Sequence, residues 1–157
     1  MKRILFDNMV IDKILNTEGL LQSMLKAAQG GALLLLTAHI IRDKLAETPD
    51  DIHREQLLAV YDALPKQRAA TRGFVLGTSA LGEGELVDDA TAALLGRLKT
   101  SGRGGWHDAL IAATAEGKAD VLVTEDRDLV KKVKAVGLNC EIWNFEEFAR
   151  FVQVQNP

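Results

Sequence analysis

The sequence has one cysteine, three prolines and few aromatic residues, which make up 5% of its 157 positions. A single cysteine, Cys140, excludes an internal disulfide framework and any metal site built from several cysteines. The longest apolar run, Ala32 to Leu36, is too short to cross a bilayer. No basic segment followed by an apolar stretch and a small-residue cleavage site opens the chain. We therefore expect no membrane span and a cytoplasmic protein.

An excess of positive charge is also missing, because 19 Lys and Arg residues face 22 Asp and Glu residues. Nucleic-acid binders often carry such an excess. Either this chain does not bind nucleic acid, or its negative charge is concentrated where a cation neutralises it. An apolar content of 47% is typical of a globular protein, and the length favours a single domain over residues 1–157.

Short apolar segments alternate with longer helical patterns along the chain. We expect strands at residues 4–6, 32–36, 74–76, 121–123 and 140–143. We expect helices over residues 10–25 (as one stretch or a pair), 38–47 with Thr37 as N-cap, 51–64, 88–98, 108–116, 129–136 and 145–152. Glycine-rich loops are expected at 77–84 and 100–105. Strands separated by helices favour parallel βαβ units. The predicted fold class is α/β, a three-layer sandwich around a central, mainly parallel sheet.

Acidic residues stand near the ends of the predicted strands. Asp7 directly follows the strand at 4–6, and Asp126 is the third residue after the strand at 121–123. Asp43 lies in the helix after the Leu-rich strand, and Asp108 begins a later helical pattern. In parallel sheets, ligands bind outside the carboxyl ends of the strands. We therefore expect the four carboxylates to converge at one edge of the sheet.

Converging carboxylates repel one another, and a divalent cation removes that repulsion. Mg²⁺ and Mn²⁺ prefer oxygen ligands and are commonly held by a few carboxylates together with a substrate phosphate. The three histidines, His39, His53 and His107, are scattered and do not have the spacing of a zinc site. The cofactor expected is thus Mg²⁺ or Mn²⁺.

Each acid also has a structural alternative. Asp7 and Asp126 are suited to cap the helices that follow them, with Asp128 favouring the first turn of the second helix. Asp108 suits a first helical turn, and Asp43 is flanked by Arg42 and Lys44, as in a surface ion pair. Glu47, one turn later, could take the place of Asp43.

Four segments together resemble the PIN-domain family, in the order that this family has them: 4–8, 37–45, 107–115 and 123–129. The resemblance covers nearly the whole chain, and its last two segments are the most specific. It implies a PIN-like fold with Asp7, Asp43, Asp108 and Asp126 as the acidic quartet. Thr124, Asn8 and Asp128 would be auxiliary residues. Asp43 departs from the family pattern, in which the second acid is usually glutamate.

The activity that the resemblance implies is that of a metal-dependent endoribonuclease. It hydrolyses RNA phosphodiester bonds and leaves a 5′-phosphate and a 3′-hydroxyl, with no covalent intermediate on the protein. The resemblance further implies the toxin of a type II toxin–antitoxin pair, with an antitoxin protein and a second copy of the chain as partners. A stand-alone PIN protein is equally compatible with the residues, since the middle segment 65–105 is long and glycine-rich.

Two groups of basic residues are candidates for RNA contacts. Arg97, Lys99 and Arg103 precede the helix that carries Asp108, and Lys66, Arg68 and Arg72 form a second group. Solvated charged loops are the alternative for both groups. Trp106, His107 and Cys140 are interpreted as packing residues.

Two other functions compete with the ribonuclease. A non-catalytic PIN-fold adaptor that binds RNA or protein would account for the departure at Asp43 and for the acidic charge balance. A phosphohydrolase with Asp7 as nucleophile would need a second aspartate two residues later, and Met9 stands there instead.

Overall fold

The computed structural model describes residues 1–72, 84–85, 89–98 and 103–155, with the side chains of Arg72, Glu85 and Arg103 excepted. The strand expected at 74–76, most of the loop expected at 77–84 and the candidate Lys99 lie outside the described residues.

A five-stranded, wholly parallel sheet forms the centre of the molecule, in the order β3-β2-β1-β6-β7. These strands are β1 (Lys2–Phe6), β2 (Leu33–Thr37), β3 (Lys66–Arg68), β6 (Val121–Val123) and β7 (Glu141–Trp143). The chain moves outward from β1 to β2 and β3, then returns to the other side of β1 for β6 and β7. The strand order therefore reverses between β1 and β6. Two short parallel strands, β4 (Thr71–Arg72) and β5 (Gly84–Glu85), form a separate pair.

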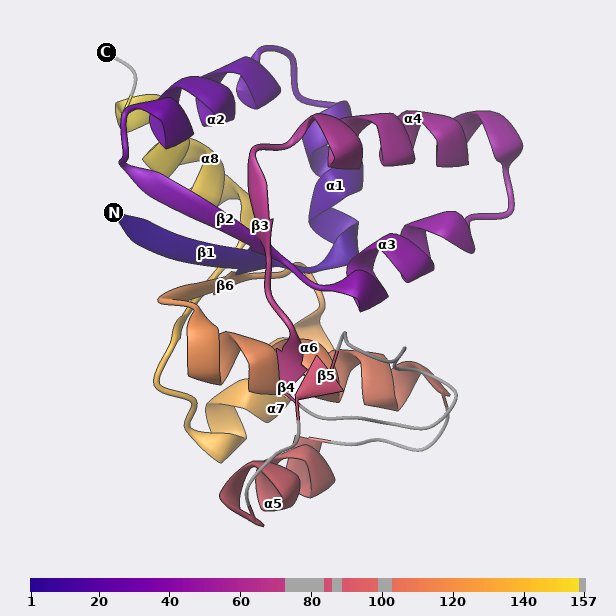
Figure 1. Ribbon diagram of the computed structural model, residues 1–157, viewed down its shortest axis with the longest axis vertical. Helices are drawn as coiled ribbons and strands as arrows, with labels where there is room; N and C mark the ends of the chain where they lie inside the picture. Colours follow the sequence, from indigo (N-terminus) through magenta and orange to yellow (C-terminus); the bar gives the residue numbers. More distant parts are fainter. Residues whose placement is uncertain (73–83, 86–88, 99–102, 156–157) are drawn as a thin grey trace.

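Helices cover both faces of the sheet (Figure 1). On one face lie α1 (Asn8–Leu15), α2 (Leu20–Gln29), α3 (His39–Ala46), α4 (Asp51–Ala63) and α8 (Phe145–Val154). On the other face lie α5 (Asp89–Leu98), α6 (Arg103–Lys118) and α7 (Arg127–Val136). The α/β three-layer sandwich with a central parallel sheet is thus confirmed. None of the described helices is long and apolar enough to span a membrane.

The central strands are buried on both faces, which explains their continuous apolar sequences. Ile4, Leu5 and Phe6 of β1 are 0% exposed, as are the three valine and leucine residues of β6. Phe6 packs against Phe148 of α8, with ring centroids 6.3 Å apart. Cys140 is buried, as expected of a packing residue, and its burial raises the pKa of its thiol to about 11. Trp106 packs against the same core.

Two local predictions are wrong. Thr37 is the last residue of β2 and does not cap α3, whose N-cap is Ala38. Helix α6 begins at Arg103, so Asp108 lies in its second turn and not at its start. The sequence favoured a loop there because glycine is costly inside a helix. In the structure Gly105 is a buried residue of α6.

The hydroxyl of Thr37 is hydrogen-bonded to the phenol of Tyr61 on α4, with the oxygens 2.6 Å apart. Both residues are buried. Tyr61→Phe leaves the Thr37 hydroxyl without this partner, so we expect a loss of about 1–2 kcal/mol in the free energy of unfolding. Urea denaturation measures this loss. The double variant Thr37→Val/Tyr61→Phe should regain part of it, because neither buried hydroxyl then remains; a further loss in the double variant would contradict the assignment.

Candidate active site

Asp7 stands at the point where the strand order reverses. It directly follows β1, and its backbone N–H still donates to the carbonyl of Val123 at 3.0 Å, which extends the pairing of β1 with β6. Crevices outside the carboxyl ends of the strands at such a switch point are the usual ligand sites of open parallel sheets. The Asp7 side chain is only 2% exposed.

Hydrogen bonds fix the Asp7 carboxylate. Oδ1 accepts the backbone N–H of Asn8 at 2.6 Å, which makes Asp7 the N-cap of α1. Oδ2 accepts the hydroxyl of Thr124 at 3.2 Å. The Thr124 hydroxyl in turn accepts the backbone N–H of Asp126 at 3.1 Å. Thr124 therefore joins the end of β1 to the end of β6, so the expected convergence of these two strand ends is seen directly.

Asp108 and Lys44 complete a charged group around Asp7. The Lys44 ammonium lies 3.3 Å from Oδ1 of Asp108, and the two side chains are 23% and 18% exposed. Burial raises the pKa of Asp7, and the negative charge of Asp108 adds to this rise. The Lys44 ammonium and the hydrogen bonds from Asn8 and Thr124 act in the opposite direction, but burial prevails. Two carboxylates and one ammonium thus share a partly desolvated space.

The other two acids of the predicted quartet are placed differently. Asp126 is the N-cap of α7, and its Oδ1 accepts the backbone N–H groups of Asp128 and Leu129 at 2.8 and 3.0 Å. Asp43 is exposed on α3. Asp128 is exposed as well and lies 3.5 Å from Lys131. The structure brings Asp7, Asp108 and Thr124 together, with Asp126 bonded to Thr124 through its backbone.

Lys44 is the residue that the sequence analysis missed. It follows Ile40 by four residues and Ile41 by three, and both isoleucines are fully buried. Residues at these spacings share one face of a helix, so the apolar pattern of α3 directs Lys44 inward. Asp43, one position earlier, has this spacing from Ile40 but not from Ile41, and its side chain is exposed. The spacing of the buried isoleucines was the available signal.

The donor set suits a hard divalent cation in part. Among the described residues, no three His, Cys, Asp or Glu side chains form a ready metal-binding group. Mg²⁺, however, is often held by only one or two carboxylates, with waters and substrate phosphates as further ligands. Asp7 and Asp108 meet that requirement. The amide oxygen of Asn8 is buried without a hydrogen-bond partner among the described residues, and such an orphaned oxygen is typical of an unseen water or ion.

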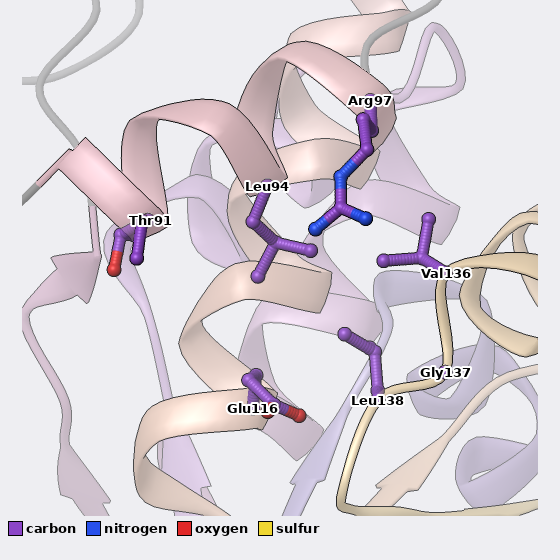
Figure 2. Close-up of a pocket in the computed structure, with 8 residues that line it drawn as sticks. Thr91, Leu94, Arg97, Glu116, Val136, Gly137 and Leu138 are labelled. Carbon is purple, nitrogen blue, oxygen red and sulfur yellow. The ribbon is translucent and has the colours of Figure 1, made fainter.

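Arg97 lies away from these acids. It lines a cavity of about 280 Å³ between α5, α6 and the turn after α7. Figure 2 shows its guanidinium pointing into this cavity, between Leu94 and Val136. Glu116, on the same cavity wall, follows Asp108 on α6 by eight residues, about 12 Å along the helix. Its carboxylate holds Asn139 through two hydrogen bonds of 2.6 Å. This cavity is therefore separate from the acidic site.

The remaining basic candidates belong to the edge strand β3, or their side chains lie outside the described residues. Lys66 and Arg68 belong to β3, the edge strand. Lys66 lies over the ring of Tyr61, 4.3 Å from its centroid. The side chains of Arg72 and Arg103 are outside the described part of the structure, as is Lys99.

The fold and site define an α/β protein with a buried carboxylate, Asp7, and a partly exposed one, Asp108, at the switch point of a parallel sheet. No family model matches the chain, and no curated protein matches it. Among solved structures, the chain is similar to one in the crystal structure of VapBC2 from Rickettsia felis bound to a DNA fragment from their promoter. The TM-score is 0.47 at 14% identity, over 90% of this chain and 98% of the other. At this level of likeness, the function has to be inferred from the chain's own residues.

Proposed function

We propose that this protein is a metal-dependent endoribonuclease of the PIN-domain family, in which Asp7 and Asp108 hold Mg²⁺ or Mn²⁺. The observation that carries the proposal is the buried Asp7 carboxylate at the β1–β6 switch point, close enough to Asp108 for the two charges to interact. Asp126 is the third candidate ligand. Both of its capping hydrogen bonds end on Oδ1, so Oδ2 is the oxygen that would face a cation.

The chemistry assigns a different task to each residue. A bound divalent cation activates water and polarises a phosphodiester. Asp7 is held in one orientation by Asn8 and Thr124, and Asp108 is carried by the second turn of a long helix. Ligands fixed in this way need little reorganisation when substrate binds. The Lys44 ammonium balances the two carboxylates when no cation is bound, and becomes available to a substrate phosphate when one is.

The reaction needs no covalent step on the protein. We propose that hydrolysis leaves a 5′-phosphate and a 3′-hydroxyl. The thiol of Cys140 is buried, and its raised pKa, about 11, keeps it protonated at neutral pH. It is therefore unsuited to act as a nucleophile.

Cleavage of a pool of single-stranded RNA oligonucleotides tests the proposal. We expect cleavage with Mn²⁺ or Mg²⁺, none with EDTA, and products whose 5′ ends carry phosphate. Asp62→Asn is a matched control, since Asp62 is an exposed acid on α4. It should cleave as the unmodified protein does. Cleavage that persists in EDTA, or that gives 2′,3′-cyclic phosphate ends, would contradict the metal mechanism.

A finer version of the proposal is the toxin of a type II toxin–antitoxin pair, which acts as a homodimer and is bound by an antitoxin. It follows from the resemblance of the sequence segments to the PIN-domain family. A stand-alone ribonuclease is the other version. The two differ in whether the chain co-purifies with a small DNA-binding protein encoded beside it.

The Lys44–Asp108 ion pair favours a second candidate, a non-catalytic adaptor that binds RNA or protein. In an adaptor, the ammonium would neutralise the carboxylates permanently, and no cation would be required. Titration with Mn²⁺ separates the two functions. A rise in melting temperature that Asp108→Asn removes supports the nuclease, and no rise in the unmodified protein supports the adaptor.

A further inference from the structure

A second cavity opens at the same edge of the sheet as the acidic site. Its volume is about 370 Å³, near the lower end of the ~300–1,000 Å³ range of small-ligand sites. Six residues line it: Thr124, Glu125, Arg127, Val130, Lys131 and Asn144. They come from the segments that follow β6 and β7 and from the first turns of α7. The cavity therefore lies beside the switch point, on the β7 side.

Thr124 belongs to both the cavity and the acidic site. It is one of the residues that line the cavity, and its hydroxyl donates the hydrogen bond to Asp7. A phosphodiester held at Asp7 and Asp108 would thus have the neighbouring part of its strand at the mouth of this cavity.

The charged groups of the lining favour an anion. Arg127 and Lys131 are exposed and, four residues apart, lie on one face of α7. Glu125 is the one acid of the lining, and it is already engaged: it accepts the backbone N–H of Phe145 at 2.7 Å and lies 3.2 Å from the Lys13 ammonium. Lys131 is 3.5 Å from Asp128, in a pair whose side chains are about 80% exposed. Such a pair is weak and gives way to a stronger anion.

We propose that this cavity binds the nucleotide of the RNA strand next to the scissile phosphate. Its phosphate lies against Arg127 and Lys131, and its base or ribose packs on Val130. This inference rests on the proposed function, because it takes RNA as the ligand. It adds a substrate-binding site on α7 that is distinct from the cavity around Arg97.

The test measures RNA affinity in EDTA, where the proposed reaction cannot occur. The probe is a fluorescently labelled single-stranded RNA of mixed sequence, and the readout is fluorescence anisotropy at several salt concentrations. We expect Arg127→Gln and Lys131→Gln each to weaken binding about three- to tenfold. Each should also lower the slope of log affinity against log salt by about 0.7, as the loss of one phosphate contact to a single strand does.

Lys134→Gln is the matched control, because Lys134 is an exposed lysine of the same helix that does not line the cavity. It should leave affinity and salt slope unchanged. Equal effects of Lys131→Gln and Lys134→Gln would overturn the inference, and so would an unmodified chain that does not bind RNA. If RNA binds with the expected losses but is never cleaved, the binding site stands and the nuclease proposal fails. If cleavage occurs while Arg127→Gln and Lys131→Gln leave affinity unchanged, the nuclease proposal stands and the binding site on α7 is wrong.

Discussion

Asp7→Asn is expected to abolish cleavage of RNA while making the metal-free protein more stable. Removal of a proposed metal ligand should lower the cleavage rate at least about 1,000-fold, which corresponds to about 4 kcal/mol of activation free energy. In EDTA at neutral pH, the same substitution should raise the free energy of unfolding by about 1 kcal/mol, or the melting temperature by roughly 2–4 °C. Asparagine keeps the N-cap of α1 and removes a buried charge.

The pH dependence of this gain follows from the raised pKa of Asp7. In the folded state the carboxyl group holds its proton more tightly than in the unfolded chain. The stabilisation that comes from this tighter proton binding is complete below the ordinary pKa of 3.8. It is lost as the pH rises through the higher pKa that Asp7 has in the folded state. The advantage of Asp7→Asn should therefore fade on acidification toward pH 4 and be full at neutral pH. Thermal melts in EDTA across this range measure it. An Asp7→Asn protein that is less stable than the unmodified protein at pH 7 would show that the buried charge of Asp7 does not destabilise the folded state.

Lys44→Met is expected to tighten Mn²⁺ binding by about ten- to a hundredfold. An ammonium within a few ångströms of the proposed ligands repels an incoming dication by several kcal/mol at an effective dielectric constant near 20. Movement of the Lys44 side chain away from the cation recovers part of that energy. The metal-free variant should be less stable, by about 1 kcal/mol, since Asp7 and Asp108 lose their counter-charge. Isothermal titration calorimetry with Mn²⁺ gives the dissociation constant, and thermal melts in EDTA give the stability.

Arg42→Met serves as control, because Arg42 is an exposed cation of the same helix. It should change the Mn²⁺ dissociation constant less than twofold. A Lys44→Met protein with unchanged or weaker Mn²⁺ affinity would show that Lys44 does not compete with the cation. Metal affinity is the decisive readout, since loss of a phosphate contact from Lys44 could lower cleavage independently.

The sequence predicted those parts of the fold that depend on continuous burial. The strands at 4–6 and 121–123 are buried on both faces, so their apolar runs identify them without ambiguity. Strand β3 gave no such signal. It reads Lys-Gln-Arg, and it pairs in parallel with β2 at the edge of the sheet. Backbone pairing at an edge does not require apolar side chains, so the strand has no apolar pattern that would reveal it.

The residues of the candidate site could be predicted from the sequence to a similar extent. Asp7, Thr124 and Asp126 follow directly from where the strands end, because the parallel sheet brings these ends to one edge. On a helix, by contrast, one position changes the direction of a side chain by about 100°. The choice between Asp43 and Lys44 therefore depends on helix phase, which the position of α3 on the sheet fixes. The assignment of Asp43 as a catalytic residue stays a prediction, and its exposure on α3 favours Asp108 as the partner of Asp7.

The central position of β1 has a consequence for the order of events during synthesis. Asp7 follows β1 directly, but the hydroxyl that orients it belongs to Thr124, 117 positions later. Asp108 also comes from the last third of the chain. Contacts so distant in sequence form late in folding. A chain synthesised only as far as β3 thus carries Asp7 without these partners, and under the proposed function it would not yet be able to cleave RNA.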